Sequence, residues 1–108
     1  MRALLLLMAV LPFGALALSP EAQEFVRITQ EIEPMQCKKR QLRRQIVMAE
    51  AEKRGEDARR LRADFDRLDR DPKTAKLERR LAELQPRITQ DDLPEINRRN
   101  VEAFYRCE

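Results

Sequence analysis

The sequence predicts an all-α fold, a small antiparallel bundle of about four helices, with an elongated helical hairpin as the alternative. Apolar residues recur at alternating spacings of three and four along most of the chain, as they do on one face of an α-helix. The period-two alternation that is typical of strands is absent. The 108 residues are 43% hydrophobic and 38% charged, which allows one small domain with a thin core.

Residues 1–17 have the composition of a secretory signal peptide. A single positive charge is followed by a short apolar run that Pro12 and Gly14 interrupt, and then by small residues that end at Ala17. The apolar run is too short for a membrane-spanning helix. We expect cleavage after Ala17 and export to the periplasm or the extracellular space, with residues 18–108 forming the mature domain.

The first helix of the mature domain is predicted to begin at residues 19–21. Ser19 offers an N-cap hydroxyl, Pro20 is favoured at the first helical position, and an acid follows at the positive end of the helix dipole. The heptad-spaced apolar stripe that starts here contains Pro34, which predicts either a kink or the start of a new helix. Gly55, which follows two basic residues, predicts the end of this helix and a turn.

Two further helix starts are predicted. Asp71 and Pro72 offer a cap and a first-position proline, and residues 92–95 resemble a capping box. The apolar stripe resumes about half a turn out of phase after Gly55 and again after Pro72, which favours a turn at both places. We therefore prefer a chain that reverses direction at both breaks, and an arrangement that ignores the break at residues 71–72 stays open.

Cys37 and Cys107 are the only cysteines, and export would take them to a compartment where disulfides persist. A bridge between them closes a loop of 71 residues, for which the chain-entropy model gives about 4 kcal/mol of stabilisation. A disulfide that contributes this much stabilisation matters most for a domain whose hydrophobic core is small. A redox-active thiol or an intermolecular bridge is the alternative, which the absence of a Cys-x-x-Cys motif disfavours.

The composition excludes most enzyme chemistries. The chain has no histidine, and Ser19 and Gly55 are the only serine and the only glycine after residue 17. Histidine-based acid–base catalysis, histidine metal sites, serine nucleophile elbows and glycine-rich phosphate loops are therefore ruled out. We expect no catalytic site, no metal site and no cofactor.

A run of five cations without an acid follows Cys37 directly, and we treat it as a candidate anion-binding site. Its ligand would be an acidic protein, an anionic membrane surface or a polysaccharide; the alternative is a solvated face that acids on neighbouring helices neutralise. Nucleic acid is disfavoured by export and by the scarcity of aromatic residues for base stacking. The site consists of Lys38, Lys39, Arg40, Arg43 and Arg44.

The apolar stripe before Cys37 is the second candidate site, because a bundle built from residues 37–107 need not cover it. Its alternatives are an intramolecular core and a homodimer seam. The hypothesis is an exported, non-catalytic interaction module, an adaptor, inhibitor or holdase-like chaperone, for another envelope or secreted protein. The competing hypothesis is an envelope-surface binder that uses the basic run. The stripe consists of Phe25, Ile28, Ile32 and Met35.

Overall fold

The computed structural model describes residues 18–107, and these residues form four α-helices and one short 3-10 helix without a strand. The predicted all-α fold is confirmed. The predicted signal peptide lies outside the described residues. Within the described range, no helix is long and apolar enough to cross a membrane. The helices are α1 (Pro20–Ala51), α2 (Gly55–Asp69), α3 (Pro72–Leu84), η1 (Gln85–Arg87) and α4 (Leu93–Arg106).

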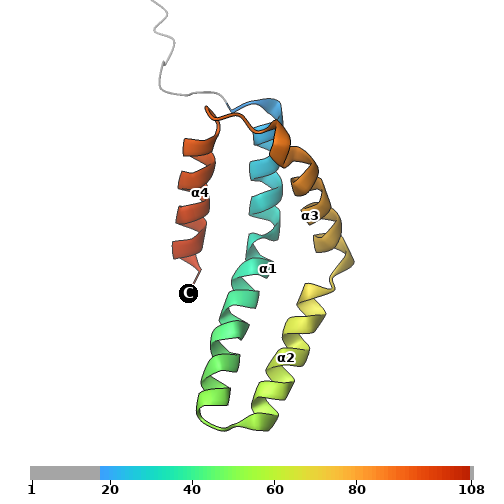
Figure 1. The fold of residues 1–108 in the computed structure, drawn as a ribbon, viewed down its shortest axis with the longest axis vertical. Coiled ribbons are helices and arrows are strands. Elements are labelled where there is room, and N and C mark those ends of the chain that lie inside the picture. The colour runs from blue at the N-terminus through green and yellow to red at the C-terminus, as the bar shows by residue number, and fades with distance from the viewer. Residues whose placement is uncertain (1–17, 108) are drawn as a thin grey trace, which may run out of the picture.

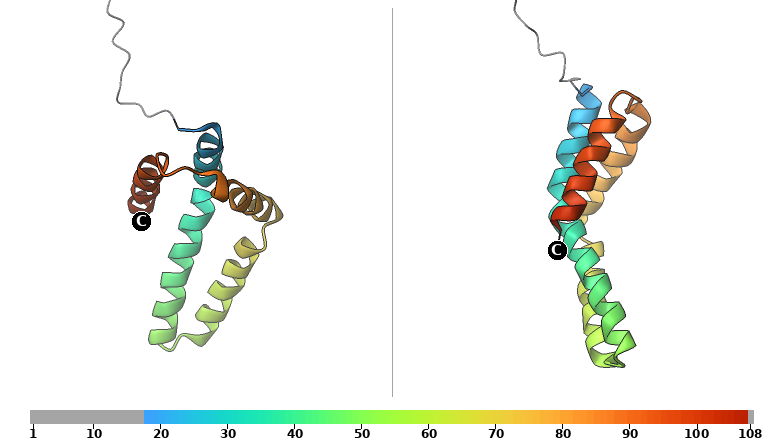
Figure 2. Two further views of the ribbon diagram at one scale, coloured as in Figure 1. Left: turned by 45° about the horizontal axis from the view of Figure 1, so that its top comes forward. Right: turned by 90° about the vertical axis from the view of Figure 1, so that its left-hand side faces the viewer.

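The other three α-helices all lie alongside the long helix α1 (Figure 1). α2 runs back along the C-terminal half of α1, α3 continues in the same direction beside the N-terminal half, and α4 returns on the other side of that half (Figure 2). α3 and α4 do not pack against each other. We call residues 18–37 with α3, η1 and α4 the upper part, and residues 38–51 with α2 the lower part.

The break at residues 71–72 does not reverse the chain, so the chain order that we preferred is wrong and the arrangement that ignores this break is correct. The predicted cap is present, because the Asp71 carboxylate accepts hydrogen bonds from the Thr74 amide at 2.9 Å and the Thr74 hydroxyl at 2.8 Å. One interruption of the helix is enough to rotate the apolar stripe of α3 toward α1. The phase shift that we read as a reversal is therefore a rotation about the helix axis.

The turn between α1 and α2 lies where Gly55 predicted it, but Lys53 has the left-handed conformation, with φ 58°. The Lys53 amide donates to the Glu50 carbonyl at 3.1 Å and the Arg54 amide donates to the Ala49 carbonyl at 2.8 Å. This pair of hydrogen bonds is a Schellman motif, whose left-handed position glycine normally occupies. Gly55 itself begins α2.

The core is thin, and α1 supplies most of it. α1 continues through Pro34, so no new helix begins there. Ala22 and Val26 of α1 form a cluster with Ile96 of α4 near the top of the upper part. In the lower part the buried apolar side chains are Leu42, Ala49 and Ala58, and the two alanines let α1 and α2 approach closely. The buried apolar residues are Ala22, Val26, Ile28, Ile32, Leu42, Ala49, Ala58, Leu84 and Ile96.

Candidate functional site

The structure gives the predicted docking stripe an internal role instead. Ile28 and Ile32 are 1% and 7% exposed, and Phe25 packs, half-buried, against the cluster of Ala22, Val26 and Ile96. α3 lies beside the N-terminal half of α1 and is joined to it there by the hydrogen bonds of Arg80 to Glu24, because the chain does not reverse at residue 71. Ile28 and Ile32 are therefore not available to a partner, whereas Phe25 and Met35 are half-buried.

The upper end of α4 is fixed by the carboxylate of Asp92, which is 4% exposed. Asp92 accepts hydrogen bonds from the Ser19 amide at 3.0 Å and the Ser19 hydroxyl at 2.8 Å, and from the Thr89 amide and hydroxyl at 3.1 and 2.8 Å. These donors, the Ser19 amide foremost, hold the pKa of Asp92 at about 2. Ser19 also caps α1, so this carboxylate joins the start of α1 to the start of α4.

The lower end of α4 is fixed by the disulfide between Cys37 and Cys107, whose Cα atoms are 5.5 Å apart. The predicted pair is thus brought together in the structure. Between the two attachment points, α1 and α4 leave an apolar groove of about 410 Å³. Val26, Pro34 and Ala103 contribute to its lining. α4 is therefore held at both ends and loosely packed between them.

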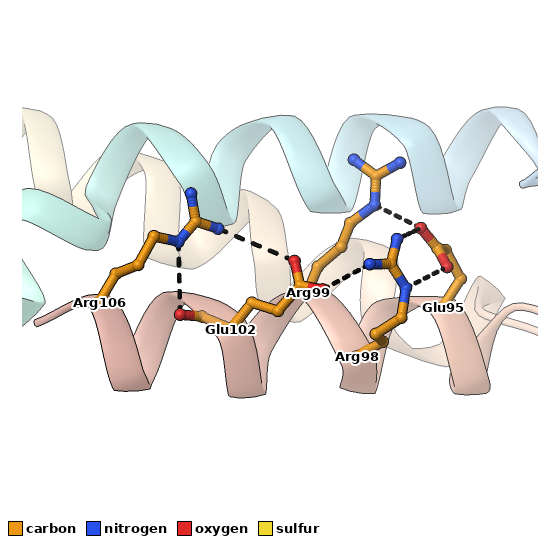
Figure 3. A network of polar contacts seen from close by, with 5 residues as sticks. All are labelled: Glu95, Arg98, Arg99, Glu102 and Arg106. Atoms are coloured by element: carbon orange, nitrogen blue, oxygen red, sulfur yellow. Dashed lines mark hydrogen bonds and ion pairs between the residues drawn. The ribbon is translucent and has the colours of Figure 1, made fainter.

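The polar face of α4 neutralises itself (Figure 3). Glu95 pairs with Arg98 at 2.5 Å and with Arg99 at 2.9 Å, and Glu102 pairs with Arg98 at 2.5 Å and with Arg106 at 4.0 Å. The Arg98 and Arg99 guanidinium groups lower the pKa of Glu95 to about 2. None of these ion pairs involves the basic run of α1, which is therefore not neutralised by the acids of α4.

The basic run divides into internal and external cations. Lys39 is 8% exposed, pairs with Asp69 at 2.6 Å, and lies 5.3 Å from the centre of the Phe65 ring. Its ammonium lowers the pKa of Asp69. Arg40 pairs with Glu33 at 2.5 Å, about two turns before it on the same helix. Lys39 therefore holds α2 against α1 and is not available to an external anion.

The other three cations of the run are exposed. The Arg43 guanidinium lies 5.1 Å from the centre of the Phe65 ring. Lys38 and Arg44 form no ion pair within residues 18–107. The charges of Lys38 and Arg44 are therefore uncompensated within the described residues, so binding of an acidic ligand by the basic run stays a prediction for these two cations.

Two aromatic side chains at the end of α4 complete the candidate site. Phe104 is 57% exposed and its ring centre lies 5.2 Å from the Arg40 guanidinium, while Tyr105 is 76% exposed and meets Phe104 edge to face. With three arginines they line a groove of about 330 Å³ beside Cys107. We call this the junction surface; it consists of Arg40, Arg43, Arg44, Phe104 and Tyr105.

Sequence reasoning missed the aromatic half of this site. Phe104 reads as one more apolar residue of the last helix, and nothing in the linear pattern brings it beside Arg40. The usable signal was its position three residues before Cys107, because the expected bridge places the end of the chain next to the basic run. Among the described residues no group of three or more cysteine, aspartate or glutamate side chains is arranged to hold a metal ion.

No protein-family model, curated protein or solved structure matches this chain.

Proposed function

We propose that this protein is an exported, non-catalytic helical module that binds another envelope or secreted protein through its junction surface. One observation carries the proposal: the large apolar side chains that the described chain exposes all belong to α1 and α4, and none to α2 or α3. The exposed large apolar side chains are Val47, Met48, Leu93, Val101, Phe104 and Tyr105. Phe104 and Tyr105 adjoin each other in the junction surface, and adjoining exposed apolar side chains are typical of an interaction surface.

The residue types of the junction surface support this proposal. Tyrosine, other aromatic side chains and arginine are enriched where protein interfaces derive most of their binding energy. Arg43 and Arg44 would also raise the association rate with an acidic partner. The stacking of Arg40 on Phe104 holds both side chains in place before binding, which lowers the entropy cost of association.

The cysteine pair connects the proposed function with the expected compartment. Phe104 and Tyr105 lie beside the arginines because Cys107 is tied to Cys37. In a reducing compartment that tie would open and α4 would be free to leave α1 at this end. Export would therefore be a condition for assembling the surface.

Site-specific photocross-linking in the native cells tests the proposal. We expect a photoreactive amino acid at position 105 to give an adduct with a second protein. The same probe at Lys76, an exposed residue of α3, serves as the matched control and should give none. Exchange of Cys37 for serine should lower the adduct yield at position 105 at least tenfold. Recovery of monomer alone would contradict the proposal.

An envelope-surface binder is the second candidate, and the exposed, unpaired Lys38 and Arg44 favour it. Binding of this kind is electrostatic and disappears as salt screens the charges. Sedimentation with vesicles of phosphatidylglycerol and phosphatidylethanolamine at low and high ionic strength separates the candidates. Binding at low salt that vanishes at high salt favours the surface binder, whereas a protein complex that persists in high salt favours the module.

A further inference from the structure

The face of α1 that contacts α4 continues beyond the end of α4. Ala22 and Val26 pack against Ile96 of α4, Val26 also lines the groove between α1 and α4, and Cys37 is bonded to Cys107. At 100° per residue, nine positions of α1 lie within about 80° of one another on this face. We call them the α4 seam; they are Ala22, Val26, Thr29, Glu33, Cys37, Arg40, Arg44, Val47 and Ala51.

α4 covers the first five positions of the α4 seam and reaches the sixth, Arg40, only through Phe104. It ends at Arg106, and Cys107 holds that end level with Cys37. Beside the lower part no described helix lies on this side of α1, since α2 occupies the opposite side (Figure 1). Val47 is consequently 62% exposed and Ala51 is also exposed. The open stretch from residue 40 to residue 51 is about 16 Å long, or three helical turns.

The spacing of the open positions matches the surface of a helix. Arg40, Arg44, Val47 and Ala51 follow one another at four, three and four residues, which is the spacing at which one helix packs against another. The methyl group of Ala51 permits a close approach. Phe104 and Tyr105 close the upper end of the open stretch, next to the two arginines.

The charge of this stretch selects an acidic occupant. Residues 38–49 contain no acid, and their exposed cations are Lys38, Arg43 and Arg44, since Lys39 pairs with Asp69 and Arg40 with Glu33. Arg44 has no ion pair in the described structure, and the acids of α4 pair with the arginines of their own helix. A helix seated here would place its residues against two arginines at one end and against Val47 and Ala51 at the other.

We propose that the open stretch of the α4 seam binds an amphipathic helix of the partner protein, about three turns long. This helix would carry Asp or Glu where it faces Arg44, and apolar residues where it faces Val47 and Ala51. It would lie end to end with α4 and continue the packing that α4 makes above the disulfide. The inference rests on the proposed function and specifies the secondary structure and charge of the partner segment.

A second copy of this chain fits the open stretch less well. In a two-fold antiparallel pairing centred near Val47, Phe104 and Tyr105 stay uncovered. A pairing that covers these aromatic side chains brings the arginines of the two copies together, which is electrostatically unfavourable. An anionic membrane would meet only Val47 and Met48 as large exposed apolar side chains on residues 38–51 of α1. Both occupants remain as distinguishable outcomes of the test.

The test places the photoreactive amino acid at seam positions 47 and 51 of the full-length protein in its native cells. Position 45 is the control, because Gln45 is exposed on the same helix about 160° away from Val47. We expect adducts with one protein at positions 47 and 51, at least tenfold above position 45. Mass spectrometry should map the linked partner residues to one segment, three or four residues apart and next to Asp or Glu.

Charge reversal supplies the second arm of the test. Arg44→Glu should lower the adduct yield at position 47 at least tenfold, whereas Arg79→Glu, the same change at an exposed residue of α3 without an ion pair, should leave it unchanged. Circular dichroism verifies that both variants fold, as their exposure predicts. Val47→Asp, probed from position 51, gives an independent variant with the same expected loss.

The outcomes that overturn the inference differ from those that overturn the proposed function. An adduct of twice the chain mass, a lipid adduct, equal yields at positions 45 and 47, or an unchanged yield in Arg44→Glu each rejects the partner helix. Adducts at position 105 without adducts at positions 47 and 51 reject the inference and leave the proposed function standing. No adduct at any of these positions rejects both.

Discussion

The upper and lower parts share α1 but are held together by different means. In the upper part, α4 is tied to α1 by the disulfide and by the Asp92 carboxylate, and α3 is tied to α1 by the two hydrogen bonds of Arg80 to Glu24, at 2.7 and 2.9 Å. The lower part is a two-helix hairpin. Its polar ties are ion pairs between α1 and α2, such as Lys39 with Asp69.

This difference explains where the candidate surface lies. Three helices enclose apolar side chains from both sides of α1, whereas a hairpin leaves one face of each helix without a neighbour. The exposed Val47 and Met48 lie in the lower part, whereas Leu93, Val101, Phe104 and Tyr105 lie on α4, the last two at the border with the lower part. The upper part therefore holds α4 and its aromatic side chains in place, and the lower part leaves the adjoining face of α1 without a neighbouring helix.

Loss of the disulfide is expected to have the largest effect, and it acts on the upper part. Closure of a 71-residue loop contributes about 4 kcal/mol in the chain-entropy model. Cys37→Ser, or reduction of the natural protein, should lower the melting temperature by more than about 10 °C. Thermal unfolding followed by circular dichroism measures the shift, and the melting temperature of the serine variant should not respond to reductant. An equal melting temperature of the natural protein with and without reductant would show that the disulfide does not stabilise the fold.

Core truncation should distinguish the two parts. Leu84 in the upper part is fully buried, whereas Leu61 in the lower part is half-buried. We expect Leu84→Ala to lower the free energy of unfolding by about 3 kcal/mol and Leu61→Ala by about half as much. Urea unfolding measures both values under one set of conditions. Equal losses would mean that the two parts are packed equally well.

Acid should weaken the attachment of α4 through Asp92. The folded pKa of about 2 lies below the ordinary 3.8, so the carboxylate stabilises the fold above about pH 4, and this contribution disappears as the pH falls toward 2. In Asp92→Asn the fall in melting temperature between pH 4 and pH 2 should be smaller. Glu95→Gln is the control. Glu95 also has a pKa of about 2, but its side chain is 32% exposed to screening solvent, so the change should be slighter.

The smallest effects are expected at the turn of the lower part. Lys53 is in the left-handed region, so Lys53→Gly should raise the free energy of unfolding by about 0.5 kcal/mol. Gly55 has no positive φ and open space around a Cβ, so Gly55→Ala should also raise it, by about 0.4–1 kcal/mol. Chemical denaturation measures both. Destabilisation by Gly55→Ala would show that glycine is needed at position 55 and not at position 53.

Much of the fold was accessible from sequence because it depends on neighbouring residues. Ser19 and Asp71 cap helices where the sequence placed the caps, and the turn between α1 and α2 lies at the predicted place. The direction of α3 was not accessible, because a phase shift of the apolar stripe fits both a reversal and a rotation about the helix axis. That ambiguity also misplaced the docking stripe, since a reversed α3 would have left Ile28 and Ile32 uncovered.

The sequence by itself determined the helices, their starting points, the cysteine pair and the run of cations, because each depends on local propensity, on spacing or on the count of a residue type. Only the tertiary structure decided that Lys39 is internal, that Phe104 meets Arg40, and that α4 stops halfway along α1. These properties come from contacts between residues more than 25 positions apart. Which side chains such contacts cover is fixed by helix direction and rotation, and the linear pattern contains neither.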